Sequence, residues 1–201
     1  MAGLQQTRFV DWAAEPDHKE LTVASQLLTG DPIAALPRLM VLAERGSATS
    51  MICIGDAYRF GLGTNVDSQK AEDWYRRAVL KGAVLGYYDL ASLYLATHRV
   101  GEARRLLEFS AARGYPPALN LLGRMYLSGN GAEKDLQRAR LYLERASAAG
   151  HIPGKAALAR LLMKHQRGFL MRARGALLMI TAQISLWIIL FWEGFSSERL
   201  R

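Results

Sequence analysis

The amino-acid sequence repeats itself at a spacing of 68 residues, and this self-similarity limits the possible fold more than any other feature. Residues 54–63 align without a gap with residues 122–131, through a shared pattern of small, aromatic and glycine residues. The correspondence continues through Asp67 with Asp135, Ala71 with Ala139, Trp74 with Tyr142, Arg77 with Arg145, Ala78 with Ala146 and Gly82 with Gly150. Self-similarity at a fixed spacing indicates an array of stacked units rather than a single closed core.

A shorter and more divergent copy lies between these two segments. Residues 90–94 match the first half of the unit and residues 103–114 match the second half. Its connecting loop is four residues shorter, because residues 98–101 take the place of the loop that contains two glycines in the other copies. Partial copies flank the array, with a second half at 31–46 and a first half at 156–163. The unit boundaries therefore lie at about 47–82, 83–114 and 115–150.

Each unit has the pattern of a helical hairpin. In residues 115–150, apolar residues recur every three or four positions, which is the period of a helix with one buried face. Gly129 and Gly131 allow positive φ and end the first helix, and the carboxylate of Asp135 can cap the second. Because one hairpin cannot bury both of its faces, we expect the units to stack into a short α-solenoid. The predicted buried positions are Ala118, Leu121, Leu122, Met125, Ala139, Tyr142, Leu143 and Ala146.

These residues resemble the Sel-one-like repeat family, which is related to tetratricopeptide repeats. The resemblance covers about 47–163 and is strongest in the first and third units. It implies a scaffold or adaptor without a common catalytic site, in a family whose members often serve membrane-linked assemblies such as bacterial envelope and exopolysaccharide machinery and protein quality control. The matching residues are Gly55, Tyr58, Gly61, Gly63, Asp67, Lys70, Ala71, Trp74, Tyr75, Ala78 and Gly82, and then Ala118, Leu122, Gly123, Tyr126, Gly129, Gly131, Asp135, Ala139, Ala146 and Gly150.

The second constraining feature is an apolar stretch that lies outside the repeat pattern. Residues 175–192 contain no charged side chain, and as a helix these 18 residues would span roughly 27 Å, close to the hydrocarbon thickness of a bilayer. Trp187 and Trp192 lie toward its far end, where aromatic residues favour the membrane interface. The stretch therefore predicts a transmembrane helix. A buried core helix and an apolar tail that closes a soluble homodimer are the alternatives.

The basic residues next to this stretch predict its orientation. Four cations and no acid lie between positions 164 and 174, in a chain whose formal net charge is +8. By the positive-inside rule, the repeats should face the cytoplasm and the short tail should lie outside. The first twenty residues lack an apolar core, which argues against a secretory signal or a transit peptide. We expect the cations to contact anionic lipid headgroups: Lys164, Arg167, Arg172 and Arg174.

Two further groups of residues are candidate contacts with partners. Thr181, Gln183 and Ser185 are polar residues within the apolar stretch, and such groups tend to face another helix. They predict docking onto a partner membrane protein or onto a second copy of the chain. Tyr87 and Tyr88 fall outside the repeat pattern and are possible partner contacts, whereas the tyrosines that recur with the repeat are expected in the core.

The composition and motifs argue against several functional classes. One cysteine and four scattered histidines make a zinc or iron–sulfur site improbable. The glycine loops lack the Lys-Ser/Thr of a phosphate-binding loop, and the sequence contains no recognisable catalytic motif. Acids interleave with the arginines of the second helices, so a solvated helix face is favoured over a nucleic-acid surface. We therefore expect no enzyme activity, no metal and no cofactor.

These inferences combine into one expected organisation. The chain should be all-α, a short α-solenoid of stacked hairpins plus one C-terminal transmembrane helix. It should act as a non-enzymatic, single-pass adaptor of a bacterial inner membrane that binds a membrane complex or a cytoplasmic protein segment, with envelope polysaccharide synthesis or secretion as the suggested process. The alternative is a structural accessory subunit of an energy-transducing or transport complex, bound mainly through its helix; self-association stays open. The expected segments are an N-terminal cap at 1–46, repeats with a capping helix at 47–166, a basic segment at 167–174, the membrane helix at 175–192 and a tail at 193–201.

Overall fold

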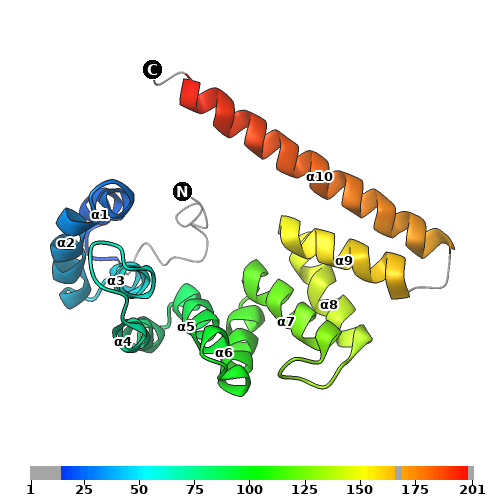
Figure 1. Cartoon of the computed structure of the whole chain (residues 1–201), viewed down its shortest axis with the longest axis horizontal. Helices are drawn as coiled ribbons and strands as arrows, with labels where there is room; N and C mark the ends of the chain where they lie inside the picture. Colours follow the sequence, from blue (N-terminus) through cyan, green and yellow to red (C-terminus); the bar gives the residue numbers. More distant parts are fainter. Residues whose placement is uncertain (1–14, 166–168, 199–201) are drawn as a thin grey trace. The chain divides into compact units, whose positions relative to one another are not determined.

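The computed structural model describes residues 15–165 and 169–198, and within these ranges it contains ten α-helices and no strand (Figure 1). The all-α prediction is confirmed. The helices are α1 (His18–Gly30), α2 (Pro32–Glu44), α3 (Ala48–Phe60), α4 (Ser68–Leu80), α5 (Val84–Ala96), α6 (Val100–Ala112), α7 (Pro116–Ser128), α8 (Leu136–Ala148), α9 (Ile152–His165) and α10 (Phe169–Glu198).

The chain divides into two compact units, Met1–Arg113 and Gly114–Arg201. The first unit contains α1 to α6 and the second contains α7 to α10. Within each unit, consecutive helices pack against one another, so that hairpins follow one another along the chain. The predicted hairpins of residues 47–82, 83–114 and 115–150 correspond to α3–α4, α5–α6 and α7–α8.

The hairpins begin and end where the sequence places capping residues. Asp67 accepts a hydrogen bond from the backbone N–H of Lys70 at 3.0 Å, and Asp135 accepts from the N–H groups of Gln137 and Arg138 at 2.9 Å. These bonds satisfy donors that the first turn of a helix leaves unpaired. Gly61 and Gly129 end the preceding helices with φ of 72° and 79°, a conformation that favours glycine.

Small residues set the distance between the two helices of a hairpin. A Cβ added at Gly123 would lie 2.7 Å from Leu143 Cγ and 3.2 Å from the carbonyl oxygen of Ala139. Gly55 lies in the same way against the ring of Tyr75, where an added Cβ would be 2.5 Å from Cε1. Gly123 is therefore a point of close approach between α7 and α8. Fully buried alanines line the second helices: Ala71, Ala78, Ala103, Ala139 and Ala146.

The shortened loop of the middle unit still forms a hairpin. α5 ends at Ala96 and α6 begins at Val100, and His98 takes the positive φ of 61° that glycines take elsewhere. The residue at the N-cap position of α6 is Arg99, which makes no side-chain cap bond to the helix. The loop is instead held by the Glu72 side chain of α4, which pairs with Arg99 as described below.

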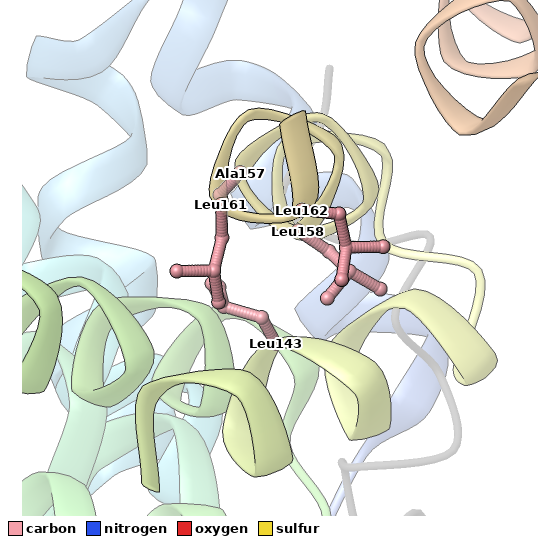
Figure 2. Packing of buried hydrophobic residues seen from close by; sticks show 5 residues of the cluster. All are labelled: Leu143, Ala157, Leu158, Leu161 and Leu162. Atoms are coloured by element: carbon pink, nitrogen blue, oxygen red, sulfur yellow. The ribbon is translucent and has the colours of Figure 1, made fainter. Parts of the chain in front are cut away.

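The last two helices pack together in the second unit. A Cβ added at Gly175 of α10 would lie 2.9 Å from the carbonyl oxygen of Ala159 and 2.9 Å from Cγ of Met163. Leu178 packs against a buried cluster that joins α8 and α9, shown in Figure 2: Leu143, Ala157, Leu158, Leu161 and Leu162. Residues Arg172–Leu190 are long and apolar enough to cross a membrane. The helix itself begins and ends beyond the predicted limits of 175 and 192.

Candidate interaction surfaces

The first unit places two carboxyl groups near each other on neighbouring helices. Asp56 of α3 accepts a 2.6 Å hydrogen bond from the hydroxyl of Tyr75, and Asp89 of α5 interacts electrostatically with Asp56. Burial, and then the charge of Asp56, raises the pKa of Asp89 to about 8, although Arg59 opposes the shift. Burial also raises the pKa of Asp56. Both carboxyls are partly exposed, so this pair can accept a cation from a partner.

The sequence analysis did not identify the acid pair. Asp89 stands where the repeat has Cys53 in the first unit and Leu121 in the third, and Asp56 stands where the third unit has Arg124. An acid at an otherwise uncharged repeat position is the signal that marks Asp89. The neighbouring Cys53 is unsuited to thiol chemistry, because burial raises the pKa of its thiol to about 12.

A second polar cluster, centred on Glu72, is structural. Glu72 of α4 accepts a hydrogen bond from Tyr94 at 2.8 Å and forms ion pairs with Arg76 at 2.7 Å and Arg99 at 2.8 Å. The Arg99 guanidinium also lies 3.8 Å from the ring centroid of Tyr94. Burial opposes ionisation of Glu72, but the hydrogen bonds from Tyr94 and Arg99 outweigh it and lower its pKa. This cluster fastens α4 to α5 and to the short loop before α6.

The two predicted contact tyrosines lie on α5, and both are partly buried. The ring of Tyr87 stacks on Phe109 of α6, with centroids 4.0 Å apart. Phe109 is 37% exposed, and the Arg113 guanidinium lies 3.7 Å from its ring centroid. Tyr87 therefore contributes to the packing of α5 on α6, beside an exposed aromatic ring. The role of Tyr87 and Tyr88 in partner binding stays a prediction.

The predicted basic group is only partly assembled in the described residues. Lys164 lies exposed near the end of α9, and Arg172 lies exposed in α10. Arg174 forms an ion pair with the repeats, since its Nη1 lies 3.5 Å from Oε1 of Glu144 in α8. Arg167 lies outside the described residues. Lipid headgroup contact by these cations stays a prediction.

The three polar residues of the apolar stretch do not share one face of α10. The hydroxyl of Thr181 donates to the carbonyl oxygen of Leu178 at 3.0 Å, and the hydroxyl of Ser185 donates to the carbonyl oxygen of Thr181 at 2.8 Å. Both hydroxyls are therefore satisfied within the helix. Gln183 is exposed and lies about 200° around the helix axis from Thr181, since each residue turns an α-helix by about 100°. A partner helix would meet Gln183 on the opposite side from Thr181.

Residues 186–190 of α10 are apolar on all sides of the helix. Five consecutive residues, from Leu186 to Leu190, are each at least 43% exposed, and five residues turn a helix by more than a full circle. On the near half, Leu177 and Ile180 are also more than half exposed, while Gly175 and Ala182 face α9 and are buried. The side chain of Trp192 lies outside the described residues. This is the largest run of exposed apolar residues in the described part of the chain.

No group of three or more His, Cys, Asp or Glu side chains in residues 15–165 and 169–198 is placed to hold a metal ion.

Comparison with known proteins agrees with this fold. The Sel1 repeat family model matches residues 48–82 and 116–151. The crystal structure of a Sel1 repeat protein from Oxalobacter formigenes has a TM-score of 0.72 and 20% sequence identity, over 81% of this chain and 69% of that chain.

Two curated proteins are similar over about half of this chain. The ERAD-associated E3 ubiquitin-protein ligase component HRD3B of Arabidopsis thaliana is 35% identical over 98 residues, which is 48% of this chain and 16% of that protein. Chitin synthase regulatory factor 1 of Schizosaccharomyces pombe is 32% identical over 111 residues, 52% of this chain and 24% of that protein. The chain thus spans a quarter or less of the length of these relatives. It carries two Sel1 repeats, at 48–82 and 116–151, within an all-helical Sel1-type solenoid.

Proposed function

We propose that this protein is a non-enzymatic adaptor whose Sel1-type repeats bind a protein partner while α10 anchors the chain to a membrane. The observation that carries the proposal is the exposed apolar segment 186–190 of α10, in a helix that packs against the repeat scaffold. Sel1 repeats are scaffolds for protein interaction, and they supply no common catalytic centre. Exposed apolar residues on every side of a helix favour lipid as the surrounding medium, because a protein partner would cover one face.

We propose that the membrane is a bacterial inner membrane and that the repeats lie on its cytoplasmic side. Lys164, Arg167, Arg172 and Arg174 precede the apolar stretch, as the positive-inside rule requires for that orientation. Envelope polysaccharide synthesis or secretion is the process we propose. A similar protein from fission yeast is named a regulatory factor of chitin synthase, an enzyme of polysaccharide synthesis, which supports that choice.

The acid pair suggests what the partner segment carries. Asp56 and Asp89 are partly buried carboxyls with raised pKa values, so an arriving Lys or Arg side chain would favour their ionised form and gain a charge-assisted contact. A basic segment of a cytoplasmic protein domain therefore fits this surface of α3 and α5.

The test is purification of the tagged full-length protein from membranes in mild detergent, with mass spectrometry of its companions. We expect a stoichiometric set of membrane proteins, and we expect D56N/D89N to lose it while Asp73→Asn, at an exposed position of α4, retains it. Recovery of the protein alone would contradict the adaptor proposal.

An accessory subunit held mainly by α10 is the second candidate, and exposed Gln183 favours it. An amide in an apolar helix tends to hydrogen-bond with another helix. For this candidate, Gln183→Leu should release the companions while D56N/D89N keeps them, the reverse of the adaptor result.

A further inference from the structure

The first half of α10 continues the register of the repeat. Residues 36 positions after Ala139, Tyr142 and Ala146 of α8 are Gly175, Leu178 and Ala182 of α10. All three residues are covered in the docked helix: Gly175 lies against Ala159 of α9, Leu178 packs on the cluster of Figure 2, and Ala182 is 3% exposed. The order small, large, small thus recurs in α10 at the same spacing as in α8.

The close approach between the two helices also recurs, with the small residues exchanged. In the α7–α8 hairpin the glycine is Gly123, and it faces Ala139 of the second helix. At the equivalent positions of α9 and α10 stand Ala159 and Gly175, so the glycine has moved to the second helix and still allows a close contact. α9 and the first half of α10 therefore form a fourth hairpin, which no family match covers.

The helix continues past this hairpin because its stop signal is missing. Gly82, Gly114 and Gly150 follow the earlier second helices with φ of 77° to 81°. The position 36 residues after Gly150 holds Leu186, and α10 continues without a break to Glu198.

Two positions that carry charges in the earlier second helices are apolar in α10. In the earlier second helices, one pair of positions carries an ion pair: Glu72 with Arg76, Arg104 with Glu108, and Arg140 with Glu144. The same positions in α10 are Ala176 and Ile180, which are both exposed. Exposed apolar side chains at these two positions of α10 are suited to lipid.

Docking on α9 and crossing the bilayer exclude each other. Residues 175–182 would lie in the hydrocarbon if 175–192 crossed it, and α9 would then have to enter beside them. α9 carries Lys155, Arg160 and Lys164, and the Arg174–Glu144 ion pair would be drawn in as well. Charged side chains are costly within a bilayer. α10 must therefore leave α9 before it can span.

We propose that α10 alternates between two sites, docked on α9 as the second helix of a fourth repeat, and released from α9 to cross the membrane. This rests on the membrane anchoring proposed above. In the docked state the membrane anchor is held against α9. The bilayer and α9 then compete for the same face of α10, which carries Gly175, Leu178 and Ala182. A shift between two states requires that α10 interact differently in each of them, and here its surroundings are protein in the docked state and hydrocarbon in the inserted state.

The test fixes α10 in the docked position with a chemical crosslink. Glu144→Cys and Arg174→Cys replace an ion pair whose atoms lie 3.5 Å apart, and a short cleavable bis-maleimide can join them. The native Cys53 needs no replacement, because burial raises the pKa of its thiol to about 12 and its reaction with the maleimide is therefore slow. The matched control joins Arg104→Cys to Glu108→Cys, an ion pair within α6 that leaves α10 free.

The purified full-length proteins are mixed with vesicles of phosphatidylethanolamine and phosphatidylglycerol, and the fraction that resists carbonate is measured. We expect the 144–174 crosslink to abolish that fraction, cleavage of the linker to restore it, and the 104–108 crosslink to leave it unchanged. Equal insertion of the 144–174 crosslinked protein, or failure of that crosslink to form before vesicles are added, would overturn the proposal. If the untreated protein never inserts, the anchoring itself fails, while the crosslink yield still reports docking.

A second pair of variants tests the same competition without a crosslinker. Gly175→Leu adds bulk where a Cβ already lies 2.9 Å from a backbone oxygen of α9, whereas Ala176→Leu adds apolar bulk at an exposed position. We expect Gly175→Leu to increase the carbonate-resistant fraction more than Ala176→Leu does. Equal effects of the two would mean that docking does not oppose insertion.

Discussion

The hydroxyl of Tyr75 donates a 2.6 Å hydrogen bond to the carboxylate of Asp56, which joins the two helices of the first hairpin through a buried aromatic ring. The same ring fills the space beside Gly55. A repeat position that serves the core thus also orients an acid of the candidate partner surface.

Removing this hydroxyl should weaken the fold without opening a cavity. A hydrogen bond to a charged group contributes about 1.5–3 kcal/mol, so we expect Tyr75→Phe to lower the free energy of unfolding by an amount in that range. Tyr58→Phe is the control, because Tyr58 is partly exposed and contacts Lys70 through its ring. Urea unfolding measures both. Equal stability of Tyr75→Phe and the parent protein would contradict the importance of the Asp56 bond.

The raised pKa of Asp89 predicts a dependence of stability on pH. Its carboxyl keeps a proton up to about pH 8 in the folded chain but loses it near its ordinary value of 3.8 when unfolded. Between these pH values the folded state binds more protons, so the contribution of Asp89 makes the free energy of unfolding fall as pH rises. The groups around it are Asp56 and Arg59, with Cys53 and Tyr75 nearby.

Asp89→Asn should remove this contribution. We expect it to stabilise the protein at pH 9 by more than about 1 kcal/mol, because one pKa unit corresponds to about 1.4 kcal/mol, and to change little at pH 4. Asp73→Asn at an exposed site should leave the profile unchanged. Thermal or urea unfolding across pH 4–9 measures the slope, and a slope that is the same in Asp89→Asn would show that another group carries it.

Glycines in the helices should respond oppositely to substitution, according to their neighbours. Gly123→Leu would place side-chain atoms into Leu143 and the backbone of Ala139, so we expect a loss of roughly 1–3 kcal/mol or more from overpacking. Gly101 in α6 has nothing within 4 Å of an added Cβ, and Gly101→Ala should stabilise by up to about 1 kcal/mol through helix propensity. Melting temperatures measure both. An unchanged value for Gly123→Leu would mean that this face is not buried.

A charge in the exposed apolar segment 186–190 of α10 should reduce membrane association. Ile188 is 62% exposed, so Ile188→Arg should be tolerated by the fold, but an arginine at a helix centre costs about 2.5–3.5 kcal/mol on insertion. The control is Ile33→Arg at a 74% exposed position of α2. Carbonate extraction should release Ile188→Arg and retain Ile33→Arg. Retention of both would argue against lipid contact at Ile188.

The repeat pattern predicted the hairpins closely because its signals are local. Asp67 and Asp135 cap the helices they precede, Gly61 and Gly129 end the helices they follow, and each acts through atoms a few residues away. Most of the predicted core positions are buried for the same reason, whereas Leu121 and Tyr142 are only partly buried. Tyr75, Leu107 and Leu143 occupy one repeat position, and all three are fully buried.

The acid pair and the position of α10 depended on contacts between separate helices. Asp56 and Asp89 are 33 residues apart, and the residues next to each of them do not predict that α3 and α5 bring the two acids together. The apolar stretch predicted a membrane-spanning helix. Because it is apolar throughout, the repeat spacing of Gly175, Leu178 and Ala182 within it did not stand out.

The sequence by itself therefore determined the helices, their caps, their order and the presence of one charge-free apolar helix, because period, capping chemistry and hydropathy act over a few residues. The tertiary structure decided which face of that helix meets protein, through the approach of Gly175 to Ala159, and which acids share an environment. Those outcomes depend on close packing and on burial between helices, and both quantities arise only when the helices are placed side by side.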